Sequence, residues 1–198
     1  MVFPIGKSKF VFRSTTLKVV AIVGSPRSKG SNNYLVDIVL KEIALTGIET
    51  KKFDLSQYRV SPCQGHDDCA SYVTCQQQDD APEIIDEYRN ADGVILSSPV
   101  YFGNVSAQMK AFMDRTFFCF THNIPFKARG AGLISIGHGG GADETIKIMK
   151  RFVRLADDKM LELSGYVEDV SEIKSRPELV NSAKKMGQKL AEIVKAKK

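Results

Sequence analysis

Short apolar runs bounded by turn residues alternate along this chain with segments in which apolar residues recur every three or four positions. The apolar runs have the length of β-strands, and the recurring pattern is typical of helices with one buried face. Regular alternation of strands and helices predicts a parallel sheet with helices packed on both of its faces. The predicted strands cover residues 18–24, 48–55, 92–97, 130–137 and 159–167.

Helical segments are predicted between these strands. They start near residue 34 and then cover 81–90, 106–120, 143–156 and the chain from 177. This order predicts an α/β fold, a flavodoxin-like three-layer α/β/α sandwich whose five-stranded parallel sheet has the strand order 2-1-3-4-5. In such a sheet the ligand lies beyond the carboxyl ends of the strands, at the switch point between strands one and three. We therefore expect the site in the loops after strands one, three and four.

The length of 198 residues fits one domain. We expect an N-terminal extension at 1–17 and a single domain at 18–198, with a cysteine-containing insertion at about 60–80. The apolar runs are too short to cross a membrane, and Pro4 and Gly6 interrupt the segment that a signal peptide would need. Four cysteines are too few for a disulfide framework. These features predict a cytoplasmic protein with no membrane span.

The net charge of +5 comes from the two ends of the chain. Residues 1–18 have four basic and no acidic side chains, and residues 174–198 have eight basic and two acidic ones. Residues 19–173 therefore have a net charge of −5. A terminal helix with a basic face is usually only solvated lysine, so nucleic acid is not an expected partner.

The loop Gly24-Ser25-Pro26-Arg27-Ser28-Lys29-Gly30-Ser31-Asn32-Asn33 joins the first strand to its helix. Glycines let backbone N–H groups turn toward an anion, and the start of the helix favours negative charge. The serine, asparagine and arginine side chains add donors, so the loop predicts a phosphate site. It is not a nucleoside-triphosphate loop, because Lys29 precedes Gly30 and the motif lacks the Gly-Lys-Ser/Thr ending.

Two further loops follow predicted strands. Residues 97–106 place Tyr101 and Phe102 between a proline and a glycine, which suits a flat ring ligand but also suits a turn that buries both aromatics. Residues 137–144 are rich in glycine and contain His138, which fits either a catalytic or a structural histidine.

Several of these stretches together resemble the NAD(P)H-dependent FMN reductase family. They are Gly24–Arg27 with Ser31 and Asn32, residues 91–95, residues 98–110 and Asp114-Arg115, and the match runs from about 18 to 156. The resemblance implies FMN as cofactor, NAD(P)H as electron donor and a homodimer or homotetramer, because subunits of this family commonly complete one another's flavin sites. For Asp114 and Arg115 it favours an interface or a structural ion pair.

The resemblance also implies residue roles. It assigns the FMN phosphate to Ser25, Arg27, Ser31, Asn32 and Asn33. It places the isoalloxazine ring against Pro99, Val100, Tyr101, Phe102, Gly103, Asn104 and Val105, and against Gly137, His138, Gly139 and Gly140. No side chain is needed as a nucleophile, because the flavin supplies the chemistry, and His138 is the one candidate catalytic side chain.

The predicted insertion contains the pattern Cys-x2-His-x2-Cys-x5-Cys, formed by Cys63, His66, Cys69 and Cys75. It resembles the compact motif of the iron–sulfur flavoproteins, a branch of the same family in which four cysteines hold a [4Fe-4S] cluster near the flavin. His66 stands where that branch has its second cysteine. Three interpretations stay open: a cluster with a histidine ligand, a zinc site, or a loop without metal. Cys119, in an apolar helix, is expected to be a buried small hydrophobe.

These features favour an FMN-dependent oxidoreductase that passes electrons from NAD(P)H to a flavin, quinone or protein acceptor. An alternative is an iron–sulfur flavoprotein that relays electrons with a ferredoxin-like partner. A third is a flavin redox sensor without enzymatic activity.

Overall fold

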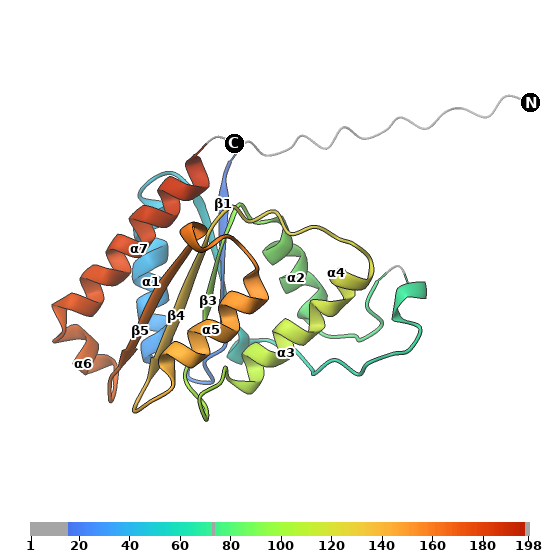
Figure 1. Ribbon diagram of the computed structural model, residues 1–198, viewed down its shortest axis with the longest axis horizontal. Helices are drawn as coiled ribbons and strands as arrows, with labels where there is room; N and C mark the ends of the chain where they lie inside the picture. Colours follow the sequence, from blue (N-terminus) through green and yellow to red (C-terminus); the bar gives the residue numbers. More distant parts are fainter. Residues whose placement is uncertain (1–15, 73, 197–198) are drawn as a thin grey trace, which may run out of the picture.

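The computed structural model describes residues 16–72 and 74–196 (Figure 1). The predicted extension at 1–17 lies outside these residues, except for Thr16 and Leu17. One parallel sheet has the order β2-β1-β3-β4-β5. Its strands are β1 (Lys18–Val23), β2 (Glu49–Asp54), β3 (Gly93–Ser97), β4 (Ala131–Gly137) and β5 (Met160–Tyr166). The predicted flavodoxin-like fold class and strand order are confirmed, and each strand end lies within one residue of its prediction.

Helices cover both faces of the sheet (Figure 1). One face has α1 (Ser31–Ala44), α6 (Val170–Lys174) and α7 (Pro177–Lys195); the other has α2 (Ala81–Asn90), α3 (Ala107–Arg115), α4 (Phe117–Thr121) and α5 (Ala142–Val153). Short 3-10 turns occur at Leu55–Gln57, Cys69–Ser71 and Asp157–Lys159. Across residues 16–72 and 74–196, no helix combines the length and the apolar character needed to span a bilayer.

The core has two halves that the central strands separate. Val19, Ala21 and Val23 of β1 pack against α1 and α7, whereas Val20 and Ile22 pack toward α2, α3 and α5. Successive side chains of a strand point to opposite faces, so a central strand covered on both sides is mostly apolar along its whole length. This explains the nearly continuous apolar runs of β1, β3 and β4 in the sequence, in which Ser97 and Ser135 are the buried polar exceptions.

The prediction of a single helix over 106–120 is wrong. The helix breaks at Thr116, whose hydroxyl donates to the Met113 carbonyl at 2.6 Å and whose N–H is shared between the Phe112 and Met113 carbonyls. A threonine hydroxyl competes for carbonyls that would otherwise continue the helical ladder. As a result, α3 and α4 are separate, and Arg115 lies at the end of α3.

Helix α6 was not predicted from the sequence. The Asp169 carboxylate caps it by accepting the Glu172 N–H at 3.1 Å, and the Glu172 carboxylate accepts the Glu168 N–H at 2.6 Å. This reciprocal pattern resembles a capping box, an acidic residue followed three positions later by glutamate, which was present in the sequence as a signal.

Candidate functional site

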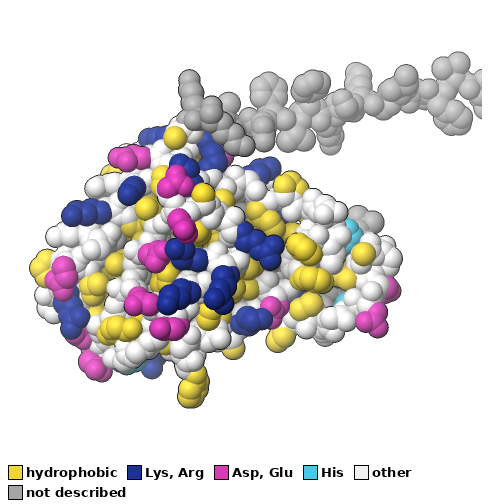
Figure 2. All heavy atoms as spheres, viewed as in Figure 1, with side chains coloured by type: hydrophobic (Ala, Val, Ile, Leu, Met, Phe, Trp, Pro, Cys, Tyr) yellow, Lys and Arg dark blue, Asp and Glu magenta, His cyan; other side chains and the backbone are white. Residues whose placement is uncertain are grey.

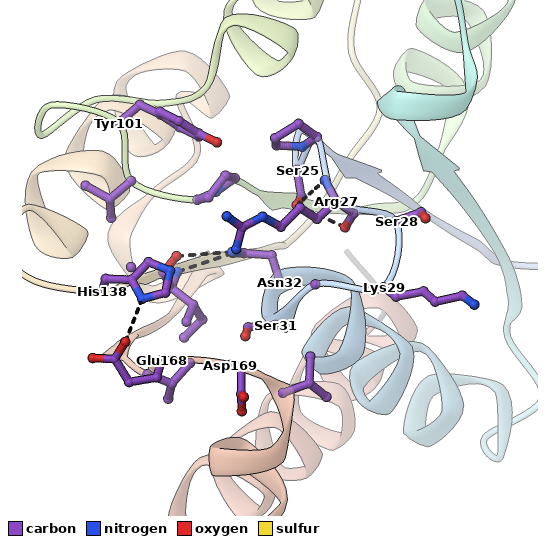
Figure 3. A pocket seen from close by; sticks show the side chains of 18 residues that line it. Ser25, Arg27, Ser28, Lys29, Ser31, Asn32, Tyr101, His138, Glu168 and Asp169 are labelled. Carbon is purple, nitrogen blue, oxygen red and sulfur yellow. Dashed lines mark hydrogen bonds and ion pairs between the residues drawn. The ribbon is translucent and has the colours of Figure 1, made fainter.

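A cavity of about 610 Å³ opens at the carboxyl ends of β1, β3, β4 and β5 (Figure 3). Its lining comes from four loops: residues 25–32 after β1, 99–101 after β3, 136–138 at the end of β4, and 167–170 after β5. Figure 3 shows Arg27 and His138 extending toward the middle of the cavity, with Tyr101 above them and Glu168 and Asp169 below. The cavity therefore lies at the edge of the sheet where the fold predicts a ligand.

The loop after β1 is folded back on itself. The buried Ser25 hydroxyl accepts the Arg27 N–H and donates to the Arg27 carbonyl, both at 3.1 Å. The Gly30 N–H donates to the same carbonyl at 3.0 Å. A Cβ on Gly30 would lie 3.0 Å from that oxygen, so a glycine suits this close turn. The turn leaves the Arg27 side chain exposed and free to reach a ligand.

The start of α1 is open to an anion. Within the part of the chain that the structure describes, no side chain caps α1 and its first turn holds no acidic residue. The first N–H groups of a helix have no partner inside the helix, and they form the positive end of the helix dipole. Ser31 and Asn32, at this end, both line the cavity. The arrangement is that of an anion site at a helix N-terminus.

Asn32 and Asn33, both predicted phosphate ligands, use their amides to hold the scaffold. Asn32 donates to the Ile136 carbonyl at 3.1 Å and accepts from the Ser97 hydroxyl at 3.1 Å and the Ile136 N–H at 3.2 Å. It therefore joins α1 to β3 and β4 under the cavity. Asn33 donates to the Arg27 carbonyl at 3.2 Å and does not belong to the lining. Direct contact of either amide with a phosphate stays a prediction.

The loop after β3 contributes Pro99, Val100 and Tyr101 to the cavity. Tyr101 and Asn104 exchange both backbone hydrogen bonds, at 3.0 and 2.9 Å, across a tight turn in which Phe102 and Gly103 have φ of 51° and 70°. Phe102 is fully exposed at the tip of this turn, and Val105 is buried in the core. The alternative in which both aromatics are buried is therefore wrong, and residues 102–105 lie outside the cavity lining.

The loop after β4 contributes Gly137 and His138, whereas Gly139 and Gly140 are exposed beyond the lining. The backbone of this loop approaches the loop after β3 closely at Gly141. Its φ is +94°, and a Cβ on it would lie 2.9 Å from the Cα of Gly103. The glycines thus let the loops after β3 and β4 pack directly against one another.

The loop after β5 is a part of the site that the sequence analysis missed. Residues 167–170 line the cavity, and Glu168 Oε2 lies 3.4 Å from His138 Nδ1. The Ser171 hydroxyl and the Glu172 N–H hold the pKa of Asp169 below its usual value, so this carboxylate stays charged at the edge of the cavity. The strand order could have indicated this loop, because β5 runs parallel to β4 and ends at the same edge of the sheet.

The predicted insertion at about 60–80, called the cysteine segment below, lies away from this cavity, and none of its described residues belongs to the lining. Cys63 and His66 are exposed, and Cys69 and Cys75 are half-buried. Within residues 16–72 and 74–196, no three or more histidine, cysteine, aspartate or glutamate side chains are gathered closely enough to hold a metal ion. Cys119 is buried, as expected, and burial raises the pKa of its thiol. The donor set of three thiols and an imidazole nevertheless has the chemistry of a soft-metal site.

A second, more apolar cavity of about 810 Å³ lies between α3, α4, the segment 123–128 and the end of α5, and Cys63 is part of its lining. The large side chains Phe117, Phe120 and Phe126 are exposed around it, and apolar side chains gather over this region of the surface (Figure 2). Exposed aromatic patches are typical of interaction surfaces. The predicted homodimer or homotetramer stays a prediction.

Comparison with known proteins agrees with this architecture. The family model of NADPH-dependent FMN reductase matches residues 17–164. An iron-sulfur flavoprotein of Methanocaldococcus jannaschii is 34% identical over 192 residues, which is 90% of this chain and 98% of that protein. An iron-sulfur flavoprotein of Archaeoglobus fulgidus is 26% identical over 92% of this chain and 98% of its own length.

Solved structures show the same fold at low identity. An NAD(P)H:quinone oxidoreductase from Methanothermobacter marburgensis has a TM-score of 0.66 at 17% identity, over 88% of this chain and 97% of that one. An archaeal flavodoxin has a TM-score of 0.56 at 12% identity, over 91% and 100%. The family model matches most of the chain, and the relative from Methanocaldococcus jannaschii is covered over almost its full length. This chain therefore belongs to the NADPH-dependent FMN reductase family.

Proposed function

We propose that the chain is an FMN-dependent oxidoreductase that takes electrons from NAD(P)H and passes them to a small-molecule acceptor. One observation supports it above the others: the uncapped start of α1 meets Ser25 and Arg27 at one end of a cavity whose other walls include Pro99 and Tyr101. The first end suits a phosphate monoester and the second suits a flat aromatic ring. A volume of about 610 Å³ is in the range of cofactor sites.

The chain's own residues would orient and anchor the cofactor. Arg27 and the backbone N–H groups at the start of α1 bind the phosphate, and Asn32 keeps the ends of β3 and β4 at a fixed distance from it. Pro99, Val100 and Tyr101 shield one side of the ring from water. FMN, when bound, supplies the one- and two-electron chemistry.

His138 is the group in the lining that is suited to move a proton. Its Nδ1 lies 3.4 Å from the Glu168 carboxylate, which orients the imidazole toward the cavity. An imidazole beside a carboxylate can take up a proton and return it to a bound acceptor. Both side chains are exposed at the cavity mouth, where an acceptor would enter.

Anaerobic mixing of the FMN-loaded protein with NADPH and, separately, with NADH tests this proposal. We expect one of the nucleotides to bleach the flavin absorbance faster than it bleaches free FMN at the same concentration. Adding a quinone should then restore the absorbance. A protein that holds FMN, is bleached by dithionite and responds to neither nucleotide would contradict the proposed donor.

A second candidate is an electron relay that combines FMN with an iron–sulfur centre. The relatives that match almost the whole chain are iron-sulfur flavoproteins, which favours this candidate. Cys63, His66, Cys69 and Cys75 would hold the centre, after the segment between them rearranges. Iron and acid-labile sulfide in protein purified without oxygen would support the relay function. Protein that contains neither under these conditions would rule this candidate out.

A further inference from the structure

Arg115 is a fully buried cation at the end of α3, and its partners all come from the cysteine segment. Its side chain is 1% exposed, and the carboxylate of Asp79, which is 3% exposed, binds it at both oxygens at 2.6 and 3.0 Å. The same guanidinium donates to the Ser61 carbonyl at 3.1 Å and to the Gln77 side-chain oxygen at 3.0 Å. Arginine suits this role because its planar fork addresses several acceptors at once.

These contacts tie the two ends of the cysteine segment together. Ser61 precedes Cys63, and Asp79 follows Cys75. The Asp79 carboxylate also accepts the Ser61 N–H at 2.9 Å, and Asp80 pairs with the Arg59 backbone through bonds of 2.6 and 2.9 Å. The base of the loop is thus fixed, while Cys63 and His66 stay exposed on its outer part.

Arg115 also reaches a sulfur. Its terminal nitrogen donates to Cys75 Sγ at 3.4 Å, a contact that the other loop cysteines do not make within the described chain. The Nε–H of the same buried guanidinium has no acceptor among the described residues. A buried donor without a partner is rare in native proteins and calls for an explanation. This unpartnered Nε–H belongs to the same guanidinium that contacts Cys75 Sγ.

We propose that Arg115 is a positioning residue for a soft metal centre in the cysteine segment: it closes the base of the loop and fixes Cys75 Sγ as the anchoring ligand. Cys63, His66 and Cys69 would supply the other donors from the outer part of the loop. Groups that hydrogen-bond a metal ligand orient it, and their loss typically weakens metal binding about 10- to 100-fold. The inference depends on the metal-containing candidate above and is independent of the flavin site.

Anaerobic titration of the reduced full-length protein with Co²⁺ tests it, because the thiolate-to-cobalt absorbance reports ligation by sulfur directly. We expect Arg115→Lys, which keeps the positive charge but loses the planar guanidinium with its several N–H donors, to weaken Co²⁺ binding about 10- to 100-fold. Lys110→Met, on the exposed side of the same helix, should bind Co²⁺ like the wild type. FMN binding to each variant, measured separately, verifies that the fold survives.

A double-variant cycle separates positioning from general destabilisation. If Arg115 acts through Cys75, then adding Arg115→Lys to Cys75→Ser should weaken Co²⁺ binding little beyond Cys75→Ser alone. Should the arginine variants fail to fold, comparison of two single cysteine variants decides: Cys75→Ser must weaken binding more than Cys63→Ser, which removes an exposed thiol.

Wild-type affinity in folded Arg115→Lys, fully additive losses in the double variant, or equal losses in the two cysteine variants would overturn the inference. A wild-type protein that binds FMN but no Co²⁺ would overturn both the inference and the metal-containing candidate, and would leave the flavin proposal standing.

Discussion

Asp79→Ala should lower the free energy of unfolding by about 3–5 kcal/mol, because it leaves the buried Arg115 guanidinium without its counter-ion. The two side chains are 3% and 1% exposed, so water cannot replace the lost carboxylate. The variant also removes the acceptor of the Ser61 and Ala81 N–H groups. Urea unfolding of the metal-free apoprotein, followed by circular dichroism, measures the effect.

Asp114→Ala is the matched control. Asp114 neighbours Arg115 in the sequence but pairs with Lys110 on the surface of α3, where both side chains are about half exposed. Exposed ion pairs of this spacing contribute little to the free energy of unfolding, so Asp114→Ala should change it by less than about 0.5 kcal/mol. Equal effects of the two variants would contradict the assignment of Asp79–Arg115 as the structural pair.

The same pair predicts a pH dependence. Burial alone would raise the pKa of Asp79, but hydrogen bonds from Arg115 and from the Ser61 and Ala81 N–H groups outweigh it and hold the pKa below its usual value. The folded state therefore binds this proton more weakly than the unfolded state does. The stabilisation is fully present above the unfolded pKa, and it is lost as pH falls through the lower folded pKa. Wild-type and Asp79→Ala stabilities should therefore converge only in acid.

Arg27→Ala should weaken FMN binding about 10- to 150-fold and leave the fold intact. A hydrogen bond from a charged donor is worth about 1.5–3 kcal/mol, and every 1.4 kcal/mol corresponds to about tenfold in affinity. The turn survives because it uses the backbone N–H and carbonyl of residue 27, which alanine retains. Fluorescence titration of the apoprotein with FMN measures the loss.

Lys41→Ala serves as the control for Arg27→Ala. Lys41 is an exposed basic residue in the last turn of α1, at the end of the helix opposite the cavity. The substitution Lys41→Ala removes the same formal charge as Arg27→Ala and leaves the predicted phosphate site unchanged. Wild-type FMN affinity in Arg27→Ala, or a matching loss in Lys41→Ala, would show that the loop after β1 does not bind the phosphate directly.

The fold was accessible from the sequence because the central strands are buried on both faces. Gly93–Ser97 and Ala131–Gly137 are buried at every position, so their runs are almost entirely apolar, with Ser97 and Ser135 as the buried polar exceptions. The break at Thr116 was hidden, because a threonine hydroxyl that bonds back to a carbonyl leaves no mark in the apolar pattern. The five residues of α6 were too few to show a helical period.

The candidate site was accessible only in part. Glycines, serines and Arg27 between β1 and α1 indicated an anion loop from composition and place alone. The role of Asn32 as a bridge to Ser97 and Ile136 depends on residues 65 and 104 positions away, which no local pattern could reveal. Arg115 was expected to form an interface or a structural ion pair, and the structure identifies its partner as Asp79.

If the loop after β1 holds the phosphate of FMN, parallel titration of the apoprotein with FMN and with riboflavin will distinguish the two ligands. The two ligands share the same ring system and differ by the phosphate. Because Arg27 and the open start of α1 act only on that group, we predict that FMN binds at least about 100-fold more tightly than riboflavin. Equal affinity for the two ligands, or no binding of either, would rule out a flavin phosphate site in this loop.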